Sequence, residues 1–306
     1  MQANIMKTVS YSTKIILDVH EFLNETGISA ERLAQLAGYS PTAVLAYLKG
    51  NYSGNIRALE GKILAAIETE KAKKNMPERE TKFVETSTSK RIYESCKLCQ
   101  IQSDLGVIFG ESGCGKTESV REYAFTHADS ILIEATMGFT ASFLFQKLNK
   151  ILGLSDNGPL CNLFENVTKK LKGSGRLLIL DEAEHLPFKA LELIRRVHDF
   201  TSCGVILVGL PELLSNLRGK RGSFTQLFSR VGFAIKLPSI NEEDAESLVR
   251  LWLPSSGDLW REFWKRSNAN ARRLSKLCRM AQHVSDVNRR IIDKMVIEKA
   301  AEVLIA

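Results

Sequence analysis

One eight-residue segment, Gly110–Thr117, constrains the fold of this chain more than any other part of its sequence. It reads GESGCGKT, which fits the phosphate-loop pattern at every required position, and it follows the apolar run Leu105–Phe109. Glycines allow backbone N–H groups to wrap phosphates, and the N-terminus of the following helix adds partial positive charge. The segment therefore predicts a nucleotide site after a buried strand, with Lys116 at the β- and γ-phosphates and Thr117 at Mg²⁺.

A second nucleotide signature is the apolar run Arg176–Leu180 followed by two carboxylates, Asp181 and Glu182. The two acids suit different tasks: Asp181 would hold the magnesium through water, and Glu182 would orient and deprotonate the attacking water. The next residues resemble a helicase box only superficially, because one residue intervenes before His185. The sequence contains one phosphate-loop domain, so a two-domain helicase motor is excluded.

The strand and helix pattern around these motifs predicts the fold class. Between residues 83 and 240, short apolar runs alternate with helical patterns, which is typical of a mostly parallel α/β sheet. The five runs are Leu105–Phe109, Ile131–Ala135, Leu177–Leu180, Val205–Val208 and Phe233–Leu237. From residue 241 to 306 the pattern is helical throughout. The sequence thus predicts a five-stranded α/β core followed by a small all-helical part.

The N-terminal region has a wholly helical pattern that predicts a helix-turn-helix. Ser29 can cap one helix, Gly38 suits a left-handed turn after it, and Ser40 followed by Pro41 begins the next helix. The residues expected to pack this unit are Leu33, Ala34, Ala37, Val44 and Leu48. The polar, charged stretch 71–82 is interpreted as a linker, which leaves residues 1–70 as a separate domain.

Composition narrows the class of protein. The chain of 306 residues is 44% hydrophobic and 25% charged, which is typical of a folded protein and excludes a disordered one. Its net charge is +7, and the excess lies at the C-terminal end, where residues 246–306 carry 12 Lys and Arg against 7 Asp and Glu. Such an asymmetry predicts a polyanion as partner.

The sequence also bears on compartment and redox state. No stretch approaches the roughly 18 apolar residues of a membrane span, and the first residues lack the apolar core of a signal peptide. We therefore expect no membrane partner and a cytoplasmic protein. The six cysteines lack metal-ligand spacing and are expected to be free thiols.

Taken together, these residues resemble the AAA+ ATPases, and specifically the Mu B type of phage and transposon target-capture protein. The resemblance covers the N-terminal helix-turn-helix and the segments Phe83–Thr86, Gly115–Glu118, Asp181–Leu186 and Gln226–Arg230. It implies an AAA+ core with a C-terminal helical lid and an ATPase that uses ATP and Mg²⁺. It further implies ATP-dependent assembly, as an oligomer or filament, on double-stranded DNA without much sequence preference. Such a protein recruits and activates a transposase of the DDE type, and ATP hydrolysis releases it from DNA. If the chain is phage-encoded, the expected compartment is the host cytoplasm.

The resemblance also assigns roles to single residues. Arg230 matches the arginine finger that acts on the nucleotide of the next subunit, and Arg273 matches the lid arginine called sensor 2. The expected nucleotide-binding residues are Gly110, Ser112, Gly113, Cys114, Gly115, Lys116, Thr117, Glu118, Asp181 and Arg273. One position departs from the family, because Leu210 follows Gly209 where a polar residue usually acts as sensor 1. Slow hydrolysis, stimulated by DNA and a partner, is therefore expected.

Three basic clusters are candidates for contact with DNA phosphates, although each also fits a solvated surface. They are Lys169, Lys170 and Lys172; Arg218, Lys220 and Arg221; and Arg272, Arg273, Lys276, Arg279, Arg289 and Arg290. The third N-terminal helix offers Pro41, Thr42 and Leu45 but no Arg, Asn or Gln, the side chains that base reading needs. The helix-turn-helix is therefore expected to contact DNA weakly or to bind protein.

Two other functions remain open from the sequence. A nucleotide-switched transcription regulator would read an operator with its helix-turn-helix and give a discrete footprint on promoter DNA. A helicase loader or secretion-associated AAA+ protein would instead bind a replicative helicase or a membrane partner.

Overall fold

The computed structural model describes residues 13–75, 83–219 and 229–304. The chain divides into two units, Met1–Thr81 and Lys82–Ala306. The first unit has one hydrophobic core, and the second has separate cores around a sheet and within a helical lid.

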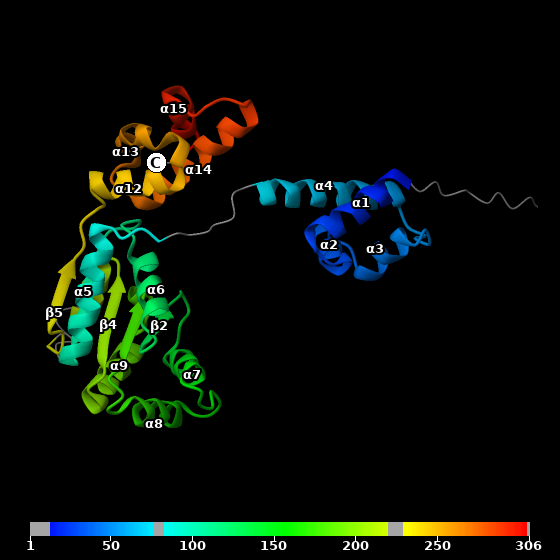
Figure 1. Ribbon diagram of the computed structural model, residues 1–306. Helices are drawn as coiled ribbons and strands as arrows, with labels where there is room; N and C mark the ends of the chain where they lie inside the picture. Colours follow the sequence, from blue (N-terminus) through cyan, green and yellow to red (C-terminus); the bar gives the residue numbers. More distant parts are fainter. Residues whose placement is uncertain (1–12, 76–82, 220–228, 305–306) are drawn as a thin grey trace, which may run out of the picture. The chain divides into compact units, whose positions relative to one another are not determined.

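Four helices make up the described part of the N-terminal unit (Figure 1). They are α1 (Thr13–Thr26), α2 (Ala30–Ala37), α3 (Pro41–Leu48) and α4 (Ile56–Asn75). The Ser29 side chain accepts a hydrogen bond from the Arg32 N–H, and the Ser40 side chain accepts one from the Ala43 N–H. Gly38 has a φ of 73°. The two predicted caps and the left-handed turn are therefore confirmed.

The predicted core residues are confirmed: Leu33, Ala34, Ala37 and Val44 are buried, and partly buried Leu48 packs against them. Tyr47 was not predicted; it is fully buried and donates its hydroxyl to Glu60 Oε1 at 2.7 Å. One detail differs from the sequence prediction: α4 continues to Asn75, so the first five residues of the predicted linker are helical. Lysine and alanine, which fill this stretch, are strong helix formers.

A parallel five-stranded sheet forms the centre of the larger unit. Its strands are β1 (Leu105–Phe109), β2 (Ser130–Glu134), β3 (Leu177–Asp181), β4 (Gly204–Gly209) and β5 (Phe233–Lys236). They lie in the order β2-β3-β4-β1-β5. The predicted α/β class and strands are confirmed, and the strand ends differ from the predicted ends by at most one residue.

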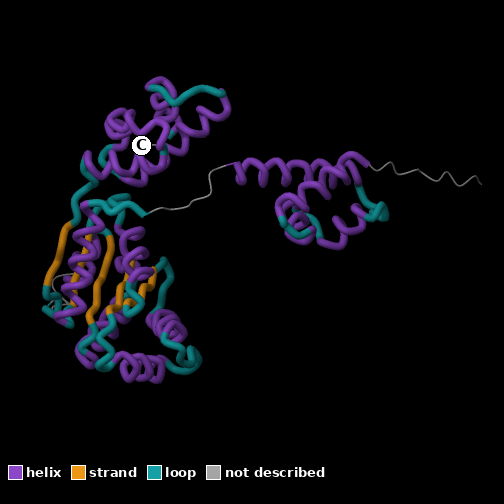
Figure 2. The backbone as a smooth tube through the Cα atoms, in the orientation of Figure 1, coloured by secondary structure: helices purple, strands orange, loops and turns teal. Residues whose placement is uncertain are grey.

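Helices lie on both faces of this sheet (Figure 1, Figure 2). On one face, α5 (Ser87–Gln102) and α6 (Lys116–Thr126) share a core with Ile108 and Ile206. The core of the other face contains Val107 and Leu207 and joins a second set of helices. These are α7 (Ala141–Ile151), α8 (Leu160–Leu171), α9 (Phe188–Thr201) and α10 (Glu212–Arg218). Because successive strand residues point to opposite faces, β1, β3 and β4 each place buried residues in both cores.

The lid, residues 241–304, is helical as predicted and has its own core around Trp260 and Phe263. Its elements are α12 (Glu242–Trp252), η3 (Pro254–Leu259), α13 (Trp260–Ser267), α14 (Ala271–Asn288) and α15 (Lys294–Val303). Buried Asp244, in the first turn of α12, joins the lid to α5. Its two carboxylate oxygens accept hydrogen bonds from the Ser87 N–H at 2.7 Å and the Ser87 hydroxyl at 2.6 Å.

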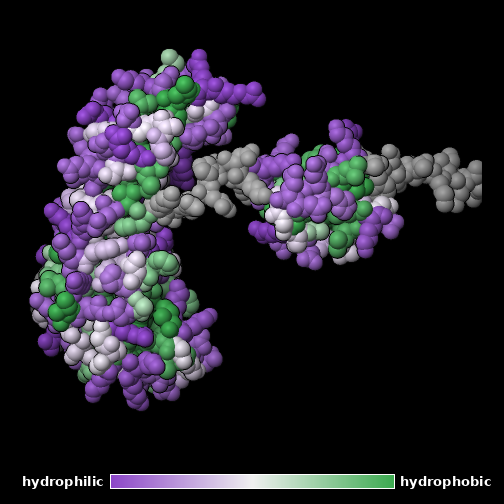
Figure 3. Space-filling model, viewed as in Figure 1, coloured by the Kyte–Doolittle hydropathy of each residue, from purple (hydrophilic) through white to green (hydrophobic). Residues whose placement is uncertain are grey.

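Hydrophilic residues make up most of the surface visible in the space-filling view, with smaller hydrophobic patches between them (Figure 3). Within the described ranges, no helix combines the length and the apolar character that a membrane span requires. All six cysteines fall in these ranges, and the structure has them as free thiols, as predicted.

Candidate functional site

The phosphate loop connects the end of β1 to the start of α6. Gly113 and Gly115 have φ values of 82° and 96°, which are left-handed conformations that glycine adopts without a steric cost. Helix α6 begins at Lys116, so the loop runs directly into unpaired N–H groups of a helix N-terminus. The fold therefore gives this loop the backbone geometry that a phosphate ligand needs.

Lys116 is held against the loop backbone. Its side chain is buried, and its Nζ donates to the carbonyl oxygens of Gly110 at 2.7 Å and Glu111 at 2.9 Å. Cys114 is also buried, with its sulfur 3.8 Å from the same Nζ. Glu118 differs from these residues, because its exposed carboxylate pairs with Arg121 on the surface of α6 at 3.3 Å.

Asp181 ends β3 and is almost fully buried. Burial raises the pKa of its carboxyl above the usual value, and hydrogen bonds from the Thr117 side chain and the Glu182 N–H oppose that shift. Its Oδ1 accepts from the Glu182 N–H at 2.9 Å, whereas its Oδ2 is buried and has no hydrogen-bond partner within the described residues. An unpaired carboxylate oxygen beside a threonine hydroxyl fits Mg²⁺, which prefers oxygen ligands. Thr117 and Asp181 would hold that ion.

Glu182, the next residue, has a left-handed backbone with φ 52° and ψ 38°. Such a conformation is costly for a residue with a side chain and is concentrated at functional sites. The side chain is half exposed, and its Oε2 lies 4.0 Å from His185 Nε2. The Glu182 carboxylate is therefore accessible, and its negative charge also raises the pKa of the Asp181 carboxyl.

At the carboxyl end of β4, where Leu210 occupies the expected sensor 1 position, the carboxylate of Glu184 lies beside Gly209. A Cβ atom added at Gly209 would lie 2.1 Å from Glu184 Oε2, so a larger residue at this position would displace the carboxylate. The same oxygen is buried and lacks a hydrogen-bond partner in the described part of the chain. Sequence reasoning missed Glu184, since only the fold brings it beside β4.

The lid reaches the phosphate loop through the first residues of α14. Asn270 Nδ2 donates to the Ser112 carbonyl at 2.7 Å, and the Ala271 N–H donates to the Gly113 carbonyl at 2.8 Å. Arg272 Nη1 donates to the Ser112 hydroxyl at 3.2 Å. Asn270 also caps α14, and its contact with the loop was not predicted from the sequence.

Arg273, the residue expected as sensor 2, makes a hydrogen bond within the lid. Its Nε donates to the Arg266 carbonyl at 2.9 Å, within the lid. Because Arg272 and Arg273 point about 100° apart on the same helix, one arginine reaches the loop while the other lies against α13. It is therefore Arg272 that bonds to the loop, and the role of Arg273 as sensor 2 stays a prediction.

Arg230 precedes β5 and lies at the end of α9. Its Nε is 3.5 Å from Asp199 Oδ1, and Asp199 also forms an ion pair with Arg195. The neighbouring motif residues Gln226, Leu227 and Phe228 lie outside the described residues.

The basic clusters occupy separate surfaces. Lys169, Lys170 and Lys172 are exposed at the C-terminal end of α8, where cations also favour the helix dipole. Arg218 ends α10, and its companions Lys220 and Arg221 lie outside the described residues. Exposed residues at helical spacing form a basic stripe on α14, defined here as Arg272, Lys276 and Arg279. This stripe begins at the phosphate loop.

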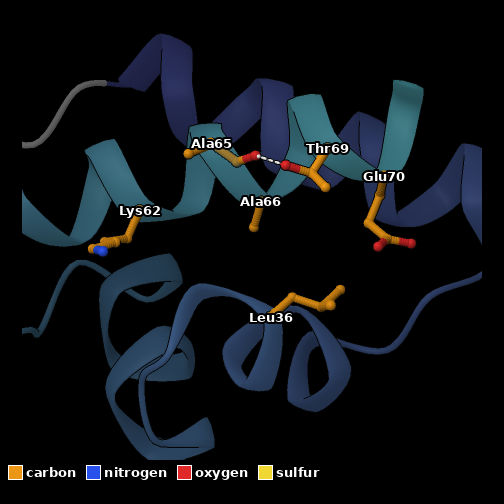
Figure 4. Close-up of a pocket in the computed structure, with 6 residues that line it drawn as sticks. All are labelled: Leu36, Lys62, Ala65, Ala66, Thr69 and Glu70. Carbon is orange, nitrogen blue, oxygen red and sulfur yellow. Dashed lines mark hydrogen bonds between the residues drawn. The ribbon is translucent and has the colours of Figure 1, made fainter. Parts of the chain in front are cut away.

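Two cavities lie apart from the phosphate loop. One, of about 220 Å³, lies between α2 and α4 and is lined by Leu36, Lys62, Ala65, Ala66, Thr69 and Glu70 (Figure 4). The Thr69 hydroxyl donates to the Ala65 carbonyl of the same helix at 2.8 Å, so it is satisfied locally. The other, of about 390 Å³, lies along β2 and α7 and includes Lys147 and Lys150.

Comparison with known proteins gives relatives along most of the chain. A protein-family model described as an AAA domain matches residues 101–217. The Mu-like prophage FluMu DNA transposition protein B of Haemophilus influenzae is 31% identical in an alignment of 246 residues, which covers 78% of this chain and 85% of that protein. The ATP-dependent target DNA activator B of Escherichia phage Mu is 29% identical in an alignment of 230 residues, which covers 72% of each chain.

Solved structures share the fold at lower identity. The ADP form of ORC2 from Aeropyrum pernix has a TM-score of 0.52 and 20% identity over 70% of this chain, which spans just under two thirds (66%) of the ORC2 chain. The RuvB Holliday junction branch migration motor of Thermotoga maritima has a TM-score of 0.50 and 18% identity, with 75% of this chain and 72% of RuvB covered. These likenesses concern the fold alone.

Proposed function

Since the chain belongs to the Mu B-type family of AAA+ ATPases, we propose that its ATP-bound form assembles on double-stranded DNA without much sequence preference. There it would recruit and activate a DDE-type transposase, and ATP hydrolysis would release it from the DNA. The names of its relatives, a DNA transposition protein and ATP-dependent target DNA activators, support this proposal.

One observation carries the proposal: a single helix, α14, meets the phosphate loop and bears a basic surface. Its N-terminal residues bond to Ser112 and Gly113, and its stripe of Arg272, Lys276 and Arg279 is exposed. A nucleotide that alters the loop therefore acts on the element that carries cations suited to DNA phosphates. This arrangement supports ATP-dependent DNA binding.

The chemistry of hydrolysis follows from side chains at the carboxyl ends of β1 and β3. Lys116 would neutralise the β- and γ-phosphates, while Thr117 and Asp181 would hold Mg²⁺, which stabilises the charge on the phosphates. Glu182 has an accessible carboxylate and would take the proton of the attacking water. Arg230 would supply positive charge to the nucleotide of a neighbouring subunit, which makes hydrolysis depend on assembly.

A sequence-specific regulator is less well supported. The exposed residues of α3 are Pro41, Thr42 and Leu45, and none of these makes paired hydrogen bonds to a base. A weak contact with DNA backbone or a contact with protein suits this surface better. A helicase loader shares the AAA+ core and differs in its partner.

Electron microscopy of the protein with plasmid DNA tests the proposal directly. With ATP and Mg²⁺, we expect the protein to coat DNA of unrelated sequences, and we expect bare DNA without nucleotide or with Lys116→Ala. A discrete complex at one promoter sequence would support the regulator instead. Binding to a replicative helicase without coating of DNA would support the loader.

A further inference from the structure

Asn270 links the lid to the phosphate loop with one side chain. Its Nδ2 donates to the Ser112 carbonyl at 2.7 Å, and its Oδ1 accepts from the Arg273 N–H at 3.0 Å, which caps α14. The next residue of the lid, Ala271, donates its N–H to the Gly113 carbonyl at 2.8 Å. Two consecutive carbonyls of the phosphate loop are thus bound by the start of a single helix.

These bonds set the direction of two N–H groups in the loop. In a trans peptide, the C=O and the N–H point in opposite directions. The peptide that carries the Ser112 carbonyl also carries the Gly113 N–H, and the peptide that carries the Gly113 carbonyl also carries the Cys114 N–H. Both N–H groups therefore point away from α14. Within the described residues, neither donates to another backbone group, which leaves both for a ligand.

The glycine at position 113 also fits a close contact between the loop and Asn270. A Cβ atom at this position would lie 2.2 Å from Asn270 Oδ1, and the φ of 82° is unfavourable for any residue with a side chain. Glycine at 113 thus serves both the turn of the loop and the close approach of Asn270.

We propose that Asn270 is a positioning residue for the triphosphate: it fixes the Ser112–Gly113 peptide so that loop N–H groups face the phosphates. The inference rests on the proposed nucleotide site. Without the bond the peptide can rotate, and orienting it again would reduce the affinity for phosphate. Loss of one such hydrogen bond corresponds to about a three- to tenfold weaker affinity.

Two substitutions separate this role from capping. Asn270→Ser keeps a capping oxygen but is too short to reach the Ser112 carbonyl, whereas Asn270→Ala removes both functions. Asn288→Ser, at the other end of α14, is the matched control, since Asn288 bonds only to Val284 among the described residues. The measurements are calorimetric titrations of the full chain with ATP and with adenosine, together with thermal unfolding.

We expect Asn270→Ser and Asn270→Ala to weaken ATP binding about three- to tenfold and to leave adenosine binding within about twofold of the parent. Only Asn270→Ala should also lower the unfolding temperature. Parent-like ATP affinity in Asn270→Ser would overturn the inference, as would equal losses for ATP and adenosine. If Lys116→Ala also binds ATP like the parent, the nucleotide site itself is wrong, and this result distinguishes the two failures.

Discussion

Arg230 Nε lies 3.5 Å from Asp199 Oδ1, so the arginine proposed to act on a neighbouring subunit is paired within its own chain. Asp199 is in turn paired with Arg195, which also binds Glu192 on the same helix. The Arg230 side chain is 57% exposed, and exposed ion pairs contribute only about 0.2–1 kcal/mol. Such a weak pair can orient Arg230 in the single chain and still break when Arg230 binds a nucleotide phosphate of the neighbouring subunit.

The substitution Lys116→Ala should weaken ATP binding about ten- to a hundredfold, because it removes a charged hydrogen-bond donor from the phosphate loop. A direct titration with ATP measures this loss, and DNA association in the presence of ATP should fall with it. Lys150→Ala, an exposed lysine on α7, is the control and should bind ATP normally. Unchanged affinity in Lys116→Ala would show that the loop is not the nucleotide site.

Replacing Glu182 with Gln should separate ATP binding from turnover. The amide keeps the shape of the side chain but cannot accept the proton, so the rate of hydrolysis should fall about a hundredfold or more. Phosphate release measures the rate, and the protein should remain on DNA with ATP. Glu165→Gln, on the exposed face of α8, serves as the control. A Glu182→Gln rate equal to that of the parent would exclude Glu182 as the base.

The backbone of the site could be predicted from the sequence, because local patterns determine it. The glycines of the phosphate loop and the apolar runs before the loop and before Asp181 define β1 and β3 within one residue. A parallel sheet then brings the carboxyl ends of both strands to one edge. No long-range information was needed for this part.

Contacts between distant segments could not be predicted in the same way. Asp244 meets Ser87 across 157 residues, and Asn270 meets Ser112 across 158. The choice between Arg272 and Arg273 depends on how α14 is rotated about its axis, which its neighbours decide. A single sequence shows that both arginines are present but not which one faces the loop.

The two neighbouring arginines should behave differently when each is replaced by Ala. Arg272→Ala removes a cation at the phosphate loop and should weaken ATP binding about tenfold, as expected for one charged hydrogen bond. Arg273→Ala removes the bond to the Arg266 carbonyl and should mainly lower the unfolding temperature. Titration with ATP and thermal unfolding of both variants test this contrast. A larger loss of ATP affinity in Arg273→Ala would instead support the sensor 2 role that the family resemblance implies for Arg273.

DNA binding should be steeply weakened by salt, because Lys and Arg that contact phosphates release counterions. Replacing Lys276 and Arg279 with Ala should flatten the dependence of log K on log salt by about 0.9 for each lost contact. Binding to fluorescent DNA duplexes of unrelated sequence, in ATP and at several salt concentrations, gives this slope. The double variant Lys169→Ala with Lys170→Ala tests whether the exposed lysines of α8 contact DNA instead. If only that variant changes the slope, α8 and not α14 contacts the DNA.

Hydrolysis should require two subunits, because the proposal has the Arg230 of one subunit act on the nucleotide of the next. Arg230→Ala alone should lose about a thousandfold in rate, a loss typical of arginine fingers. Lys116→Ala alone should be inactive, because it binds ATP weakly and lacks the charge that neutralises the β- and γ-phosphates. Mixed on DNA, the first variant supplies an intact phosphate loop and the second supplies the finger, so some interfaces become competent and ATPase activity should appear. Light scattering or microscopy must show that mixed assemblies form. If they form without activity, or if Arg230→Ala hydrolyses ATP at the parental rate, Arg230 does not act in trans.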